Sequence, residues 1–307
     1  MDKLLFFNKY AFFVAVMFAV LPRAQAQQMF DVPFVPTPYV VIEEMLRLAN
    51  VTAQDFIMDL GSGDGRVLIT AAKNFGARGL GVDLDEELIA QSRDSAEQAG
   101  VADRVTFQQQ DLFKTDLSRA SVITMYLLPG VMARLRPVLL GLKPGTRLIS
   151  HDFPFDGWKP DRVTQIRKNT FLWIVPAQVA GTWQSNIALT GGRHTVTLEL
   201  RQKFQEVDGT ARFDDRHAQV WEAHLRGDRL SFVIVDDRDR ENEASLYFEG
   251  RVSGDVLEGK IRRGTGSGQT VHEWRAVRIN PGKAAGKTNV RPVSTYPVTV
   301  GIQFKEM

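Results

Sequence analysis

Hydrophobic and polar positions alternate in two different ways along this chain, and the change falls near residue 178. Between residues 55 and 152, short apolar runs typical of buried strands alternate with longer segments whose apolar residues recur at helical spacing. An amphipathic helix over residues 40–48 is expected to precede them. This strand–helix rhythm predicts a parallel sheet covered by helices, the doubly wound α/β plan.

The expected sheet is Rossmann-like and has seven strands. Five of them are expected over residues 55–60, 79–83, 105–109, 122–126 and 147–151. Helices are expected over residues 65–75, 86–99 and 131–142, and Pro137 is expected to kink the last of these. Residues 162–165 and 170–175 are expected to add an antiparallel pair at one edge. Together these elements predict an α/β domain over residues 27–178.

Residues 179–280 follow the period-two alternation of strands, in six short segments separated by turn signals such as Asp208-Gly209 and Ser253-Gly254. The pattern predicts an all-β domain, either a small barrel or a sandwich. Its tryptophans Trp183, Trp221 and Trp274 are expected to fill the core. Residues 281–307 are rich in glycine, proline and lysine and are expected to form a flexible tail.

The N-terminal residues 1–26 have the three-part plan of a secretory signal peptide. Lys3 and Lys9 precede an apolar run over residues 10–21, and Ala24-Gln-Ala26 is a small-x-small cleavage signature. The run is shorter than the roughly 20 residues that a membrane-spanning helix needs. Cleavage is therefore expected, with an uncleaved membrane anchor as the alternative. Either reading places the body of the protein in the periplasm or outside the cell.

Composition removes several kinds of chemistry. The chain has no cysteine, which excludes disulfides, thiolate nucleophiles and cysteine-based metal sites. Its five histidines show no metal-ligand spacing, so no metal is expected. The net charge of +2 is too balanced to indicate a nucleic-acid partner, and none is expected.

The segment Asp59-Leu-Gly-Ser-Gly-Asp-Gly-Arg66 lies between an expected strand and an expected helix. Gly61, Gly63 and Gly65 allow the backbone to adopt positive φ and to approach a ligand closely. The first turn of the helix offers unpaired N–H groups to a carboxylate or a phosphate. The segment therefore predicts a binding loop for a nucleotide-like ligand.

Three acids, Asp59, Asp83 and Asp111, follow or end three successive strands, where ligands of such sheets bind. Asp83 lies about 20 residues after the loop, where an acid binds ribose hydroxyls. Asp111 is placed to accept from an adenine amino group. Asp59 and Asp64 would repel a pyrophosphate but attract an ammonium and a sulfonium, which favours S-adenosylmethionine. The alternatives are capping or turn roles for Asp59 and Asp83 and a surface position for Asp111.

These motifs resemble those of class I S-adenosylmethionine-dependent methyltransferases. More narrowly, residues 30–165 resemble the small lysine methyltransferases of mitochondrial inner-membrane proteins and their bacterial relatives. The shared segments are Pro33-Phe-Val-Pro36-Thr37, the glycine loop, and Phe153-Pro-Phe155 with Trp158. The resemblance implies a protein lysine as methyl acceptor, including one in a membrane-associated protein. Thr37 is expected to close over the cofactor.

Methyl transfer from a sulfonium is an in-line displacement, so the enzyme must chiefly align donor and acceptor. A lysine acceptor must be neutral when it attacks. Tyr126, after the fourth strand, is expected to orient the amine or to help remove its proton; the alternative is a packing role. His151 and Asp152 lie beside this position, where a structural role is the favoured reading.

The leading hypothesis is thus a methyltransferase that modifies a protein lysine. A second hypothesis is a small-molecule methyltransferase in which the β domain covers the site or holds an apolar substrate. A third is an exported binding protein that keeps the cofactor fold without turnover, since S-adenosylmethionine is made in the cytosol.

Overall fold

The computed structural model describes residues 34–189, 192–214, 216–236, 244–264 and 269–282. The expected signal peptide and nearly all of the expected tail lie outside these residues. Among the described helices, none combines the length and the apolar character needed to cross a membrane.

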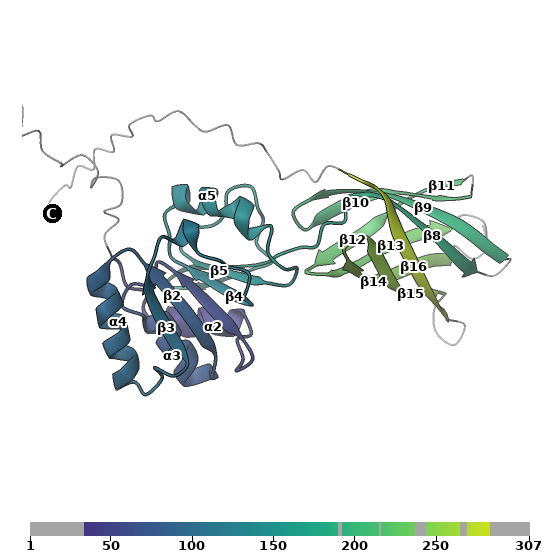
Figure 1. Cartoon of the computed structure of the whole chain (residues 1–307). Coiled ribbons are helices and arrows are strands. Elements are labelled where there is room, and N and C mark those ends of the chain that lie inside the picture. The colour runs from purple at the N-terminus through teal and green to yellow at the C-terminus, as the bar shows by residue number, and fades with distance from the viewer. Residues whose placement is uncertain (1–33, 190–191, 215, 237–243, 265–268, 283–307) are drawn as a thin grey trace, which may run out of the picture. The chain divides into compact units, whose positions relative to one another are not determined.

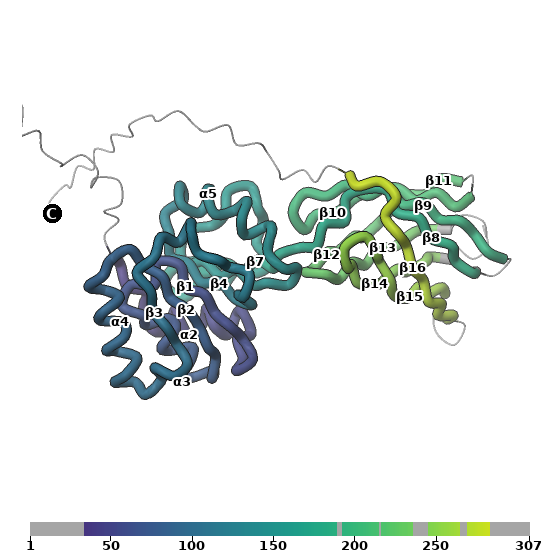
Figure 2. Tube along the Cα trace, viewed as in Figure 1, coloured from purple at the N-terminus to yellow at the C-terminus, as the bar shows by residue number. Residues whose placement is uncertain are grey.

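A first sheet of seven strands has the order β3-β2-β1-β4-β5-β7-β6 (Figure 1). Its strands are β1 (Phe56–Leu60), β2 (Arg78–Asp83), β3 (Val105–Gln109), β4 (Val122–Met125), β5 (Arg147–His151), β6 (Arg162–Ile166) and β7 (Lys168–Ile174). The first five are parallel, and β7 runs antiparallel to both β5 and β6. The Cα trace shows β1, β2, β3 and β4 side by side (Figure 2). The predicted Rossmann-like sheet is confirmed.

Helices cover both faces of this sheet. They are α2 (Tyr39–Leu48), α3 (Arg66–Phe75), α4 (Glu86–Gln98) and α5 (Pro129–Leu139), with a short 3₁₀ helix, η1 (Leu112–Lys114). The side chain of Asp85 caps α4 by accepting from the N–H groups of Glu87 and Leu88. Pro137 lies within α5, close to its C-terminal end.

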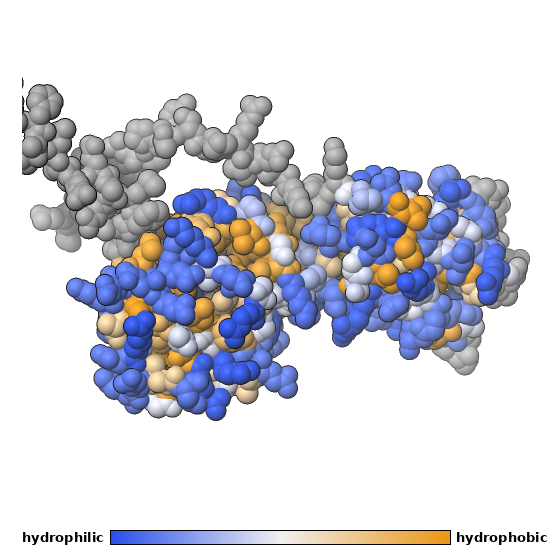
Figure 3. Space-filling model, in the orientation of Figure 1, coloured by the Kyte–Doolittle hydropathy of each residue, from blue (hydrophilic) through white to orange (hydrophobic). Residues whose placement is uncertain are grey.

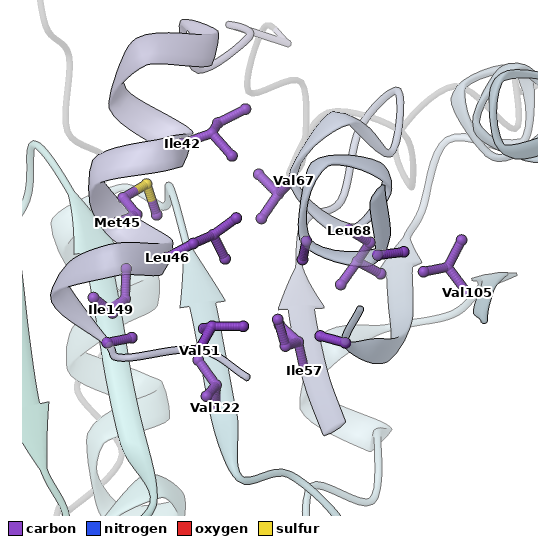
Figure 4. Close-up of a cluster of buried hydrophobic side chains, with 14 of the residues drawn as sticks. Ile42, Met45, Leu46, Val51, Ile57, Val67, Leu68, Val105, Val122 and Ile149 are labelled. Carbon is purple, nitrogen blue, oxygen red and sulfur yellow. The ribbon is translucent and has the colours of Figure 1, made fainter. Parts of the chain in front are cut away.

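Alternate strand residues supply two apolar layers. On one face, Ile42, Met45 and Leu46 of α2 point toward Val67 and Leu68 of α3 and toward the strands (Figure 4). On the other face, the buried apolar side chains of α5 pack on residues such as Met58 and Ile123. Burying side chains of this size stabilises the fold by about 1.5–3 kcal/mol each.

A second sheet of nine antiparallel strands has the order β11-β10-β9-β8-β16-β15-β14-β13-β12. Its strands are β8 (Gly181–Leu189), β9 (Gly192–Lys203), β10 (Glu206–Phe213), β11 (Arg216–Gln219), β12 (Trp221–Arg226), β13 (Arg229–Asp236), β14 (Ala244–Ser253), β15 (Val256–Arg263) and β16 (Thr270–Pro281). Contacts of β10 with β12 and of β11 with β13 nearly close the sheet into a barrel. Of the two predicted all-β architectures, the barrel is the one that forms.

The barrel core contains an aromatic cluster. The rings of Phe232 and Phe248 stack 4.7 Å apart, and Trp274 meets Phe248 edge-on at 5.0 Å. Trp183 is fully buried and donates from Nε1 to the Val179 carbonyl. The expectation that Trp183 and Trp274 fill the core is therefore confirmed.

The expectation for Trp221 is wrong, because its side chain is 56% exposed. The register of β12 against β13 shifts between Trp221 and His224, where β12 contains one more residue than its partner. Such a bulge moves the residues before it to the opposite face of the strand. Trp221 therefore faces outward, whereas Leu225 after the bulge faces the core. Figure 3 shows hydrophobic residues scattered among hydrophilic ones on the visible face, which is ordinary for a protein surface.

Candidate functional site

The glycine loop joins β1 to α3 in a conformation that requires glycine. Gly61, Gly63 and Gly65 have φ values of 77°, 52° and 78°, all in the left-handed region. The N–H groups of Gly61 and Ser62 donate to the Val82 carbonyl, which ties the loop to the end of β2. A Cβ on Gly65 would lie 2.7 Å from the Phe107 ring and 2.8 Å from the Ser92 side chain.

Asp83 lies at the end of β2 and faces this loop. Its Oδ2 accepts from the Gly63 N–H at 2.8 Å, and its Oδ1 accepts from the Asp85 N–H at 3.1 Å. Each carboxylate oxygen has a further lone pair. Asp83 can therefore hold the loop in place and still accept from two ligand hydroxyls.

Asp59 is the most deeply buried acid of the site, with a side chain next to the loop. Its Oδ1 accepts from the Thr124 hydroxyl at 2.6 Å. Burial raises the pKa of Asp59 to about 7, and the nearby Asp83 and Asp64 add to the rise. A ligand cation would stabilise the ionised carboxylate. The buried Ser62 hydroxyl also lacks a hydrogen-bond partner among the described residues.

Asp64 and Arg66 form an ion pair that ties the loop to Thr37, which lies just before α2. The Arg66 guanidinium donates to both oxygens of Asp64 and also to the Thr37 carbonyl at 3.2 Å. The charge of Asp64 is therefore compensated by Arg66. Asp59 is the acid whose charge is less compensated within the chain. The Thr37 hydroxyl lies 3.3 Å from His151 Nδ1, which brings Thr37 to the same edge of the sheet.

Asp111 follows β3 and caps η1. Its Oδ1 accepts from the Phe113 N–H at 2.9 Å, and its Oδ2 lies 3.9 Å from Lys114 Nζ. Capping thus occupies one carboxylate oxygen. Its role toward adenine stays a prediction.

Tyr126 and His151 meet at the ends of β4 and β5. Their ring centroids lie 4.3 Å apart, and the Phe153 ring stacks on Tyr126 at 6.1 Å. His151 is 2% exposed, and burial lowers its pKa, which favours the neutral imidazole. Its Nε2 is buried without a hydrogen-bond partner among the described residues.

Lys168 is a polar residue of this edge that the sequence did not reveal. It is the first residue of β7, and its Nζ donates to Asp152 Oδ2. The bond to Asp152 raises the pKa of Lys168, and the Tyr126 hydroxyl contributes to the rise. No local signal marks this lysine, because it comes to Tyr126 only through the pairing of β7 with β5.

The polar groups therefore collect at the carboxyl ends of the parallel strands, where ligands of open α/β sheets bind. The glycine loop, with Asp59 and Asp83 beside it, offers amides to a carboxylate, an acid to an ammonium and an acid to a ribose. No group of three or more acids and histidines in the described ranges is placed to hold a metal ion. The fold and the site define the class of S-adenosylmethionine-dependent methyltransferases.

Comparison with known proteins gives the family. Residues 59–162 match the ANTKMT methyltransferase domain. A protein-lysine N-methyltransferase of Saccharolobus islandicus is 41% identical over 152 residues, which cover 49% of this chain and 94% of that protein. The adenine nucleotide translocase lysine N-methyltransferase of Mus musculus is 33% identical over 132 residues, or 42% of this chain and 57% of that protein.

A solved structure is also similar. An RNA methyltransferase from Salinibacter ruber, crystallised with S-adenosyl-L-homocysteine, is 48% identical and covers 47% of this chain and 96% of its own, with a TM-score of 0.46. The chain belongs to the ANTKMT methyltransferase family, and it is an S-adenosylmethionine-dependent methyltransferase. The predicted family and cofactor are confirmed, whereas the roles of individual residues stay predictions.

Proposed function

We propose that this enzyme transfers a methyl group from S-adenosylmethionine to the ε-amino group of a protein lysine. The observation that carries the proposal is the 41% identity to a protein-lysine N-methyltransferase over nearly the whole length of that relative. The edge of the sheet that carries Asp152 and Tyr126 supports the proposal. A carboxylate and a phenol at these positions can accept hydrogen bonds from an alkylammonium.

When bound, the cofactor supplies an electrophilic methyl group on a sulfonium. The glycine loop and the first turn of α3 would hold its carboxylate through backbone N–H groups. Asp59 would pair with its ammonium, Asp83 would accept from its ribose hydroxyls, and Asp111 would accept from its adenine amino group. Thr37, whose carbonyl accepts from Arg66 and whose hydroxyl lies beside His151, would close over the cofactor.

The acceptor ammonium would give up one proton to solvent, directly or with help from the Tyr126 hydroxyl, before its nitrogen lone pair forms the new N–C bond. Tyr126 would orient the amine through its hydroxyl, and the rings of His151 and Phe153 hold Tyr126 in place. Burial lowers the pKa of His151, which favours the neutral imidazole and so disfavours a positive charge that would repel the incoming ammonium. Alignment of this kind can supply several kcal/mol of the rate enhancement.

The acceptor can be tested directly with the full-length protein and cofactor labelled in the methyl group. Incubation with a protein extract, an RNA extract and a small-molecule extract of the same cells should place the label in protein, as methyl-lysine after hydrolysis. Label in RNA or in extractable small molecules would contradict the proposal. The small-molecule hypothesis predicts the latter outcome.

The Asp83→Ala variant tests whether the labelling depends on the cofactor site. It should weaken cofactor binding by roughly 1–3 kcal/mol through loss of a charged hydrogen-bond partner. Labelling should fall at limiting cofactor and recover in part at high cofactor. Unchanged cofactor affinity in this variant would remove Asp83 from the site.

We also propose that the protein works outside the cytoplasm, because residues 1–26 have the pattern of a signal peptide. The membrane anchor stays the alternative. Either location makes a membrane-associated protein an accessible acceptor.

A further inference from the structure

Lys168 places an ammonium group of the chain itself at the edge where the acceptor must bind. Its Nζ donates to the Asp152 carboxylate, and the nearby Tyr126 hydroxyl adds to the rise in the pKa of Lys168. An alkylammonium held by a carboxylate, with a phenol nearby, presents the same chemical groups as a bound lysine substrate would.

The three residues come from separate elements that meet at the carboxyl edge of the sheet. Tyr126 follows β4, Asp152 follows β5, and Lys168 begins β7. Asp152 is held by its backbone, since its N–H donates to the Asn169 carbonyl at 2.8 Å and its φ is 70°. The buried His151 adjoins both Tyr126 and Asp152 in this arrangement. The backbone of Asp152 and the ring of Tyr126 are thus held in place before any acceptor arrives.

We propose that Asp152 and Tyr126 form the subsite for the acceptor ammonium, and that Lys168 occupies this subsite until the acceptor displaces it. The proposal rests on the proposed function, because it takes the acceptor to be an alkylamine.

Exposure supports this division of roles. The Lys168 side chain is 51% exposed, so it can leave toward solvent, whereas the Asp152 side chain is only 23% exposed. An exposed ion pair of this kind is weak, so the acceptor can displace Lys168 from Asp152 at a small cost in free energy. Asp152 raises the pKa of Lys168 and would do the same for an acceptor ammonium. The subsite therefore captures the acceptor in its charged form, and one proton passes to solvent before the nitrogen attacks. Lys168 holds the place of the acceptor until then.

The kinetic test compares variants of the full-length enzyme in protein-lysine methylation. Lys168→Ala should raise kcat/KM for the acceptor by about two- to fivefold, through a lower KM, because the internal competitor is lost. Lys168→Arg keeps the cation and should show no gain. Asp152→Asn should raise the KM. Lys143→Ala removes an exposed lysine elsewhere and should leave the kinetics unchanged. A fall in kcat for Lys168→Ala without a lower KM would overturn the proposal.

A binding test separates the subsite from the identity of the acceptor. Titration with n-butylammonium should give a saturable rise in melting temperature for Lys168→Ala. It should give a much smaller rise for the wild type and none for the double variant Lys168→Ala/Asp152→Asn.

The two experiments fail in different ways. Butylammonium binding without methylation of any protein would support the subsite and contradict the protein-lysine function. Protein-lysine methylation with equal butylammonium binding by all three proteins would support the function and overturn the subsite.

Discussion

Asp59 shows how one buried residue can make the enzyme sensitive to pH. Its pKa is raised from 3.8 to about 7, chiefly because burial disfavours the charged carboxylate. The protonated form therefore stabilises the folded state, fully below about pH 4 and progressively less as the pH rises through 7. A cofactor ammonium would favour the ionised form and oppose this loss.

We predict that Asp59→Asn removes part of the pH dependence of stability. The melting temperature of the free wild type should fall more steeply between pH 4 and pH 7 than that of the variant, because Asn does not ionise. The difference between the two curves isolates Asp59 from the other carboxylates. Cofactor should bind the wild type more tightly as the pH rises through 7, and parallel pH profiles for the two proteins would contradict the assignment.

At the scale of elements, the turn from β1 into α3 depends on both backbone strain and space. Gly65 has a φ of 78° and no room for a Cβ, whereas Gly100 after α4 has a φ of 69° and nothing within 4 Å of the position that a Cβ would take. Gly100→Ala is therefore a matched control for the strain alone.

We predict that Gly65→Ala is clearly more damaging than Gly100→Ala. Left-handed strain alone should cost about 1–2 kcal/mol in unfolding free energy. Gly65→Ala adds a clash with Phe107 and should also weaken cofactor binding, because the loop must shift. Urea unfolding and cofactor titration measure the two effects. Equal losses for both variants would show that the close packing around Gly65 is relaxed at little cost.

In the barrel, the β12 bulge predicts that Trp183 and Trp221 differ in their contribution to stability. Trp183→Ala should lower the unfolding free energy of the barrel by about 3–5 kcal/mol, because it empties a buried site. Trp221→Ala should cost much less, because the bulge turns that side chain toward solvent. Chemical unfolding followed by circular dichroism compares them, and a large loss for Trp221→Ala would mean that it faces the core.

For the whole molecule, export is the open prediction. If residues 1–26 are a signal peptide, the mature protein should begin at Gln27 and appear in the periplasmic or secreted fraction. Replacing Ala24 and Ala26 by larger residues should block cleavage and leave the longer chain on the membrane. N-terminal sequencing after fractionation measures this, and a full-length protein in the membrane fraction of wild-type cells would favour the anchor.

Much of the first sheet could be predicted because its signals are local. Apolar runs, helical spacing and the glycine loop each depend on a few neighbouring residues, and they located β1 to β5 and α3 closely. The barrel was predicted less completely: β8, β10 and β11 were not expected, because their alternation is weakened by polar and small residues. The face of Trp221 was missed because a bulge arises from strand pairing and leaves no local pattern.

The same distinction holds for the site. The identity of the cofactor follows from the order of residues along the chain, because the loop and the strand-ending acids are placed by local structure at one edge. The acceptor side depends on strand order. Only the insertion of β7 between β5 and β6 brings Lys168 to Asp152 and Tyr126. Contacts between residues so far apart in the chain are set by register and topology, which no local pattern of residue types encodes.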